Sequence, residues 1–285
     1  MSILFCIVFA LFDIPHNPNS LLDVDPELNY FGLDSDNEYS NYYTIGEYSS
    51  LSTNDFKCFR FMCVNIRSFF KNNNELSVML ECIENKPELI VVTETWFYEN
   101  SLDGVFLDGY EAFHSIRGRG GGVSVFYKIG IDCTKCDLLS FVNQNIESCC
   151  VKLNLSITIY VLAIYRPHSD SINTFTDSLE QIINSSELQN ANICLMGDFN
   201  ANILNLECSH CVNLTEVLNS YHFIPLINCP TRYGPNSSPS LLDHCWVNFF
   251  RCKTAGVILY DLSDHCPIFA HLIFNRPILI QMIEL

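Results

Sequence analysis

From Phe56 to Phe274 the sequence alternates short apolar runs with longer amphipathic stretches, and this alternation constrains the fold more than any other feature. The short runs are typical of buried strands, whereas the amphipathic stretches have the period of helices. The strand patterns occupy residues 56–66, 89–93, 109–128, 148–167, 191–202, 241–248, 254–261 and 266–274, and the helical patterns occupy residues 74–86, 175–186 and 215–223. The strands form two groups with interspersed helices, so we expect one α/β domain in which helices cover two packed sheets.

The residues before Phe56 have a different character. Residues 1–55 contain nine Asp and Glu residues and no Lys or Arg, and residues 14–55 show no apolar period. A segment of this kind cannot bury enough apolar surface to fold by itself. We therefore predict an acidic, disordered segment over residues 1–55, a folded domain over residues 56–275, and a C-terminal tail over residues 276–285.

Composition excludes two broad classes of protein. Hydrophobic residues make up 48% of the 285 residues and charged residues 16%, which rules out disorder throughout the chain. The longest apolar run, Ile3 to Phe12, is much shorter than the roughly 20 residues that a membrane-spanning helix needs. We therefore expect no stable membrane association. The same run has the length of a secretory-signal core, but no basic residue precedes it and no small-residue cleavage site follows before Asp13.

The cysteines favour a reducing compartment. The chain has 15 of them, an odd number without the spacing of a disulfide framework, which indicates free thiols and a nuclear or cytoplasmic protein. Two pairs, Cys133 with Cys136 and Cys208 with Cys211, have zinc-knuckle spacing, and a shared zinc site is the alternative interpretation of those four residues.

The net charge of −17 argues against indiscriminate electrostatic binding to nucleic acid. Much of that charge lies in residues 1–55, so the remaining domain is only moderately acidic. A nucleic-acid substrate is compatible with this balance if a divalent cation and a few well-placed arginines offset the local repulsion.

Polar side chains follow the apolar strands at the point where each strand ends. They are Asn65, Glu94, Tyr165, Asp198, Asn200 and Asp243, and the triplet Ser263-Asp264-His265 precedes the last strand. A single carboxylate at a strand end is commonly a cap or a turn residue. As a set, however, these side chains should converge on one rim of a sheet, where their mutual repulsion requires a cation. Carboxylate and amide oxygens suit Mg²⁺ or Mn²⁺ better than zinc.

A histidine beside such a cluster suits phosphodiester hydrolysis, which needs an aligned water, charge neutralisation on phosphate and help for the leaving oxygen. We favour His265 over His244 for this role. Neighbours on a strand point to opposite faces, and Asp243, next to His244, is itself expected in the site.

Seven motifs occur in an order that resembles a known superfamily. They are CVNIRS, VVTETW, GRGGGVSVFY, LAIYRPHS, LMGDFNAN, LLDHCWVN and LSDHCPI. Together they resemble the endonuclease/exonuclease/phosphatase superfamily, and more narrowly the apurinic-endonuclease-like domain of non-LTR (LINE-type) retrotransposons. The resemblance covers about Phe56 to Phe274 and implies a four-layer α/β sandwich of two packed mixed β-sheets flanked by helices.

The resemblance also implies a role for each matching residue. Asn65 and Glu94 would hold the Mg²⁺ or Mn²⁺, with Asp264 as a further ligand. Tyr165 would contact the scissile phosphate and Asn200 would hold it. Asp198 would orient or deprotonate the attacking water, and His265, oriented by Asp243, would polarise the phosphate or act as the base; the sequence leaves the choice of general base between Asp198 and His265 open. Candidate contacts to DNA phosphates are Arg117, Arg119, Arg166 and Arg232, for which the alternative is a solvated surface role.

Two departures favour the retroelement branch over the repair enzymes of the superfamily. Arg67 stands where those enzymes have an acid, and His168 stands where they have an asparagine. A retroelement nuclease would be expected to precede a reverse transcriptase domain, which this chain lacks, so we expect a truncated or stand-alone gene product. The predicted function is Mg²⁺-dependent hydrolysis of a DNA backbone phosphodiester. The alternatives are a superfamily phosphatase or phospholipid phosphodiesterase, favoured by the acidic charge, and a catalytically silent remnant.

Overall fold

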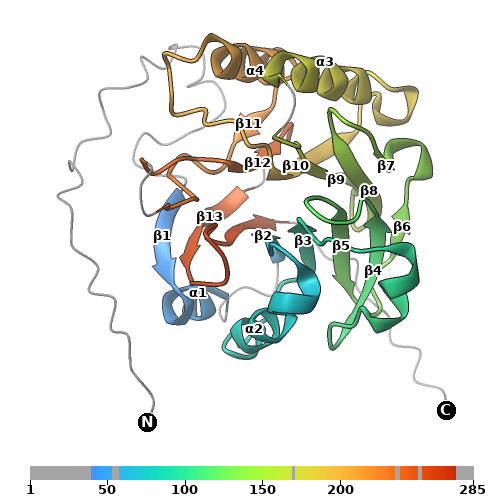
Figure 1. Cartoon of the computed structure of the whole chain (residues 1–285), viewed down its shortest axis with the longest axis vertical. Helices are drawn as coiled ribbons and strands as arrows, with labels where there is room; N and C mark the ends of the chain where they lie inside the picture. Colours follow the sequence, from blue (N-terminus) through green and yellow to red (C-terminus); the bar gives the residue numbers. More distant parts are fainter. Residues whose placement is uncertain (1–39, 53–57, 169–170, 235–237, 250–251, 274–285) are drawn as a thin grey trace. The chain divides into compact units, whose positions relative to one another are not determined.

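The structure is a computed structural model that describes residues 40–52, 58–168, 171–234, 238–249 and 252–273. In this part of the chain two β-sheets stack face to face, and helices cover the outer face of each sheet (Figure 1). The predicted four-layer α/β sandwich is therefore confirmed. The predictions for residues 1–39 and for the C-terminal tail lie outside the described residues.

The first sheet is mixed and has the strand order β1-β13-β14-β2-β3-β5-β4. Its strands are β1 (Ser40–Thr44), β2 (Cys58–Asn65), β3 (Leu89–Thr93), β4 (Tyr110–Ser115), β5 (Val123–Lys128), β13 (Cys252–Leu259) and β14 (Ile268–Ile273). Strands β2 and β3 run parallel, and their register pairs Asn65 with Thr93. The polar residues that follow these two strands are thus brought to the same edge of the sheet.

The second sheet has the order β11-β12-β10-β9-β8-β6, and β7 pairs with β8. Its strands are β6 (Cys133–Lys135), β7 (Phe141–Val142), β8 (Glu147–Asn154), β9 (Thr158–Tyr165), β10 (Asn192–Asp198), β11 (Ile224–Pro225) and β12 (Asp243–Val247). The hairpin predicted near Asn154 is present, because β8 and β9 pair antiparallel with Asn154 opposite Thr158.

Helices lie on both outer faces. They are α1 (Ile45–Ser52), α2 (Phe69–Glu81), α3 (Ile172–Ile183) and α4 (Ser209–Ser220), with short 3₁₀ turns η2 (Glu99–Gly104), η3 (Asp137–Leu139) and η4 (Ser186–Leu188). In Figure 1, α1 and α2 cover the first sheet and α3 and α4 cover the second. None of the helices in the described residues is long and apolar enough to cross a membrane.

The alternation of side chains along each strand fills three apolar layers. On β2, Phe61 and Cys63 point into the core between the sheets, whereas Met62 and Val64 pack against the helices of the first sheet. On β10, Met196 points into the central core and Leu195 faces α3 and α4. Strands covered on both faces are apolar throughout, which explains the unbroken apolar runs in the sequence.

The N-terminal boundary differs from the prediction. Residues 40–44 form β1, which pairs in parallel with β13, and residues 45–52 form α1. The sequence pattern did not predict this edge strand, because the strand is polar and is held by backbone pairing with β13. The two backbones are close at Gly256, where a side chain would lie 2.5 Å from the Asn41 carbonyl oxygen. Tyr48 of α1 is fully buried against Phe269. The predicted disordered segment therefore cannot include residues 40–52.

Candidate active site

The polar strand ends of the two sheets meet at one place. In the second sheet, Asp198 pairs in register with Tyr165 on one side and with Asp243 on the other. From the first sheet, the Asn65 side chain reaches across, and its Nδ2 donates to Glu94 Oε1 at 3.0 Å and to Asp198 Oδ2 at 2.8 Å. The convergence expected from the sequence is therefore present, and one amide joins the carboxylates of both sheets.

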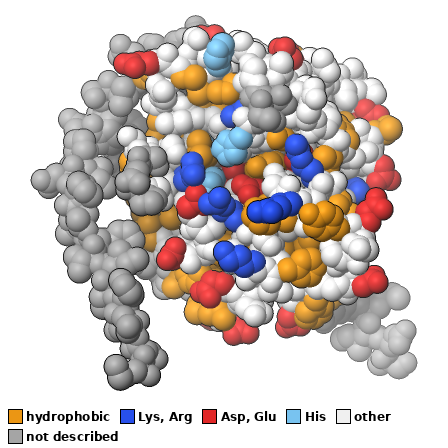
Figure 2. Space-filling view, viewed as in Figure 1, with side chains coloured by type: hydrophobic (Ala, Val, Ile, Leu, Met, Phe, Trp, Pro, Cys, Tyr) orange, Lys and Arg blue, Asp and Glu red, His pale blue; other side chains and the backbone are white. Residues whose placement is uncertain are grey.

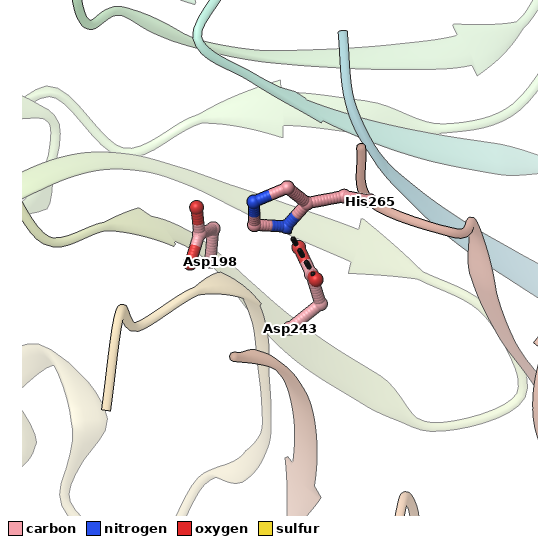
Figure 3. Close-up of side chains that lie close together, drawn as sticks. All are labelled: Asp198, Asp243 and His265. Carbon is pink, nitrogen blue, oxygen red and sulfur yellow. Dashed lines mark hydrogen bonds and ion pairs between the residues drawn. The ribbon is translucent and has the colours of Figure 1, made fainter. Parts of the chain in front are cut away.

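His265 completes this cluster. Its Nδ1 lies 2.8 Å from Asp243 Oδ2, and Asp243 Oδ2 also accepts a hydrogen bond from Thr231 Oγ1 at 2.6 Å. The ring nitrogen that does not bond to Asp243 faces Asp198 (Figure 3). Ligand atoms of Asp198, Asp243 and His265 all lie within 4.8 Å of one another. The structure thus brings His265 to Asp243, whereas His244 points away and bonds to the Ala201 carbonyl oxygen.

Burial and charge shift the pKa values of this group strongly. Burial acts to lower the pKa of His265, but the charge and hydrogen bond of Asp243 outweigh it and raise the pKa to about 9. Burial, together with the charge of Asp243, raises the pKa of Asp198 to about 7, although His265 opposes that rise. Burial and the charges of Glu94 and Asp198 raise the pKa of Tyr165, which keeps its hydroxyl protonated. Near neutral pH the group therefore holds an imidazolium, a phenol and a carboxyl close to its midpoint.

The oxygen atoms around Asn65 fit a hard divalent cation. Glu94 is buried, and the positive edge of the Asn65 amide lies between its carboxylate and that of Asp198, where a cation would relieve the same repulsion. Asn200 Oδ1 and Asp243 Oδ1 are buried acceptors without a hydrogen-bond partner among the described residues. Asp198, Asp243 and His265 form a second group of possible ligands, in which Asp243 Oδ2 and His265 Nδ1 already bond to each other.

Asp264 is in a different environment from the other predicted metal ligands. Its Oδ1 accepts from Arg67 Nη1 at 2.7 Å and its Oδ2 accepts from Arg232 Nε at 3.0 Å. Burial acts to raise its pKa, but the hydrogen bonds from Arg232 and Arg67 lower it overall. Two guanidinium groups already satisfy this carboxylate, so the structure gives no support to Asp264 as a metal ligand.

Asn200 is close to the cluster, and its side-chain amide nitrogen already has a backbone partner. Its backbone N–H donates to Asp198 Oδ1 at 2.9 Å, and its Nδ2 donates to the Arg166 carbonyl oxygen at 2.7 Å. Asn200 therefore orients Asp198 in this structure, and its predicted contact with phosphate requires the amide to change partners.

The predicted DNA-contacting arginines have four different environments. Arg166 is buried and donates to the carbonyl oxygens of Phe199 and Asn200 in the loop after β10, an environment that does not favour its predicted contact with DNA. Arg117 donates to Glu147 at 2.6 Å, Arg232 bonds to Asp264, and Arg119 is exposed. These three remain candidates for phosphate contact.

Sequence reasoning missed three supporting residues. Thr231 orients Asp243, and Arg67 bonds to Asp264. Glu147 is fully buried and accepts from the Gly122 backbone N–H and from Arg117, while a side chain at Gly121 would lie 2.5 Å from its carboxylate. The Gly-rich turn after Arg117 is thus explained by close packing around a carboxylate. The polar residue Glu147 at the start of an apolar strand was the one available signal.

Three comparisons with known proteins complement this geometry. Residues 159–269 match the protein family described as endonuclease-reverse transcriptase. This range includes Tyr165, Asp198, Asp243 and His265. It does not include Asn65 and Glu94, which lie before it. A search of the curated proteins found no match.

Among solved structures, the AP endonuclease LMAP from Leishmania major aligns with a TM-score of 0.61 at 12% sequence identity, over 77% of this chain and 89% of that one. The endonuclease domain of TRAS1, a telomere-specific non-LTR retrotransposon, aligns with a TM-score of 0.61 at 16% identity, over 75% of this chain and 98% of that one. The 3′ phosphatase NExo from Neisseria, bound to a product DNA hairpin, aligns with a TM-score of 0.58 at 14% identity, over 76% and 100%. At these identities the likeness concerns the fold.

Proposed function

We propose that the chain is a Mg²⁺-dependent phosphodiesterase that nicks DNA, as the endonuclease of a non-LTR retrotransposon would. The match of residues 159–269 to the endonuclease-reverse transcriptase family and the likeness in fold to an AP endonuclease support this proposal. The observation that carries the proposal is the cluster in which Asn65 links Glu94 to Asp198 while His265 bonds to Asp243. A phosphodiester hydrolase needs this combination of a cation site, a proton acceptor and a fixed positive donor.

The residues divide the chemistry between them. Glu94, together with Asn65 once its amide turns Oδ1 rather than Nδ2 toward the carboxylates, would hold Mg²⁺, which would neutralise charge on the phosphate and on the leaving oxygen. Asp198 accepts the proton of the attacking water, because its pKa of about 7 places it near the midpoint of titration at neutral pH. His265 stays protonated beside Asp243 and presents its second N–H to a phosphate oxygen. We accordingly assign the general base to Asp198 and the electrostatic role to His265.

Two further groups hold the phosphate in this proposal. The Tyr165 hydroxyl remains protonated, so it donates a hydrogen bond without adding negative charge. Arg232 lies between the site and solvent, with about a third of its side chain exposed, and extends the positive field beyond the cluster.

DNA is favoured over a small phosphate ester by the distribution of charge. Although the whole chain carries −17, one face shows several Lys and Arg side chains gathered around a histidine, with acidic side chains mainly at its margin (Figure 2). Basic residues near the site include Arg67, Lys71, Arg117 and Arg232. A DNA backbone can contact several of these basic side chains at once through successive phosphates, whereas one isolated phosphate cannot. Such a face should therefore bind DNA more strongly than it binds a small phosphate ester.

Relaxation of supercoiled plasmid by the full chain tests the proposal. We expect open circles with Mg²⁺, none with EDTA, and at least about a hundredfold slower conversion by Asp198→Ala or His265→Ala. Lys253→Ala, at the opposite end of the first sheet, is the matched control and should nick like the original chain. Nicking that survives in both site variants would refute the proposal. Parallel assays on an inositol phosphate and on sphingomyelin would reveal the phosphatase or phospholipid phosphodiesterase alternative, and folded protein inactive on every substrate would indicate a silent remnant.

A further inference from the structure

A pocket of about 430 Å³ lies beside the catalytic cluster. This volume is within the range of ligand-binding pockets. Its walls come from the loop after β2, the start of α2, the loop after β3 and the turn before β14, and include Arg67, Lys71, Asn72, Trp96, Ser263 and Asp264. Arg67 follows Asn65 by two residues, Trp96 follows Glu94 by two, and Asp264 precedes His265. The pocket therefore adjoins the catalytic cluster on three separate segments.

Backbone hydrogen bonds hold the pocket walls together. Ser68 N–H donates to the Glu94 carbonyl oxygen at 2.8 Å, and Trp96 N–H donates to the Gly121 carbonyl oxygen at 2.9 Å. Arg67, Glu94 and Trp96 have positive φ angles of 44°, 52° and 58°. Non-glycine residues adopt this region at a cost, and they remain there only where the surroundings fix them. The pocket is thus preorganised.

Trp96 is the aromatic residue among those that line this pocket. Its Nε1–H donates to Glu94 Oε2 at 3.3 Å, which fixes one edge of the indole. The side chain is half-buried and lines the pocket with the rest of its surface. An aromatic ring that is anchored at its edge and open on a face is suited to stacking with a nucleobase.

Two cations stand beside the ring. Arg67 and Lys71 are both exposed, and 48% of the Arg67 side chain remains accessible while Nη1 bonds to Asp264. Since Asp264 also bonds to Arg232, a phosphate that recruits Arg67 would leave this carboxylate with one guanidinium partner. Arg67 can therefore turn to an incoming phosphate without stranding a buried charge.

We propose that this pocket binds one nucleotide of the DNA strand next to the scissile phosphate, with its base stacked on Trp96 and its phosphate held by Arg67 and Lys71. The inference rests on the proposed function and adds to it a defined nucleotide subsite. Stacking recognises any base, so the subsite contributes affinity and strand placement with little sequence preference.

The two tryptophans allow a direct test without catalysis. Trp246 is fully buried in the core beneath α3 and α4, whereas Trp96 lines the pocket. We would titrate the full chain in EDTA with a short oligothymidylate and follow tryptophan fluorescence. Stacking should quench Trp96, and the Trp96→Leu variant, which retains only Trp246, should show no quenching.

Affinity for the same oligonucleotide, measured by anisotropy of a labelled strand, provides a second readout. Trp96→Leu should weaken binding at least about fivefold. Arg67→Gln should reduce the slope of log affinity against log salt by about 0.7, the value for one lost phosphate contact on a single strand. Lys253→Ala serves as the control for general charge and should leave the salt slope of binding unchanged.

The outcomes separate this inference from the proposed function. Quenching that disappears in Trp96→Leu, with a reduced salt slope in Arg67→Gln, supports the subsite whether or not plasmid is nicked. A chain that nicks plasmid but shows no quenching, or whose two pocket variants bind like the original, overturns the subsite and leaves the nuclease proposal standing. A chain that neither binds the oligonucleotide nor nicks plasmid overturns both.

Discussion

Two buried ion pairs lie near opposite ends of β2, and they differ in how completely their polar atoms are satisfied. Near the start of β2, Glu88 accepts from the Arg60 backbone N–H at 2.8 Å and from Arg60 Nε at 2.9 Å, and it bonds further to Arg60 Nη2 and Lys128. Beyond the end of β2, His265 bonds to Asp243, while Asp243 Oδ1 has no partner among the described residues.

The pKa values follow this difference. Burial acts to raise the pKa of Glu88, but the hydrogen bonds from Arg60 lower it overall, so the charged pair is favoured in the folded protein. At the other end, burial and Asp243 raise the pKa of Asp198 to about 7, so its charged form is disfavoured. A buried ion pair whose polar atoms all have hydrogen-bond partners is compatible with a stable fold. A buried polar group without a partner lowers stability, and such groups occur mainly at functional sites. We therefore expect mutations at the two ends to separate activity from stability.

Asp198→Asn should give the largest effect on activity. We expect nicking to slow by at least about a hundredfold, because the amide cannot accept the proton of the attacking water. Stability should change little, because replacing a buried carboxyl that has a raised pKa offsets the loss of one of the two oxygens that accept from Asn65 and Asn200. Plasmid nicking and thermal unfolding, measured on the same preparation, check both parts. A lower melting temperature, or activity within tenfold of the original, would show that the two ends do not differ as described.

Arg60→Met should do the reverse. Removing one partner leaves the Glu88 carboxylate buried with fewer donors, and the expected loss is about 3–5 kcal/mol of unfolding free energy. The double variant Arg60→Met with Glu88→Leu should recover much of this loss, because no buried charge is left unpaired. Urea unfolding of the single and double variants gives the coupling between them. The nicking rate per folded molecule should be unchanged, and a rate loss that exceeds the folded fraction would contradict the comparison.

The site end could be predicted from the sequence and the structural end could not. Asn65, Glu94 and Asp198 each lie at or just beyond the end of an apolar strand, and parallel register brings the ends of β2 and β3 together in the first sheet and those of β9 and β10 together in the second. The pattern did not state that the two sheets meet at these ends. Arg60 is a single charged residue within the apolar run of β2, and its partner Glu88 is the residue directly before β3. Nothing in that spacing states that the two side chains meet, because the pairing depends on the register between β2 and β3.

Residues that act through long-range contacts were likewise beyond sequence reasoning. Thr231 and Glu147 lie on segments far along the chain from the groups they orient, and no period or motif connects them. The positive charge of Arg166 beside a predicted phosphate-contacting tyrosine suggested DNA, and no pattern in the sequence showed that it bonds to backbone carbonyl oxygens of the loop after β10. The strand β1 was missed because its pairing uses backbone groups, which every residue has.

Metal binding allows a second comparison within the site, between two carboxylates. Glu94 faces the Asn65 amide, whereas Asp264 is already paired with two arginines. Glu94→Gln should weaken Mn²⁺ binding at least about tenfold, by removing the charged ligand of the proposed site. Asp264→Asn should change that affinity by less than about threefold, because Arg67 and Arg232 already neutralise this carboxylate. Counting free Mn²⁺ by electron paramagnetic resonance measures both without reference to catalysis. Equal losses in the two variants would restore Asp264 as a ligand.

The smallest expected effect concerns His271, which pairs in register with Arg60 and packs on the rings of Tyr48 and Phe269 at the structural end. Burial, and then the charge of Arg60, lowers its pKa from 6.5 to about 4. Between these two values the unfolded chain binds the proton and the folded protein does not. Its contribution to stability is therefore present above about pH 6.5 and is lost as the pH falls toward 4.

His271→Phe keeps the ring packing and removes this titration. The slope of unfolding free energy against pH between about 4 and 6.5 should fall by up to about 1.4 kcal/mol per pH unit, the value for one proton. Urea unfolding at several pH values measures the slope, with His210→Gln on the exposed side of α4 as the control. Two other histidines, the half-buried His114 and the buried His244, also have pKa values lowered to about 4, mainly by burial. They keep part of the acid sensitivity in every variant, so the difference between variants is the quantity that decides. An unchanged slope would mean that His271 is protonated in the folded protein, and the structural end would then hold an unsatisfied charge of the kind that distinguishes the catalytic cluster.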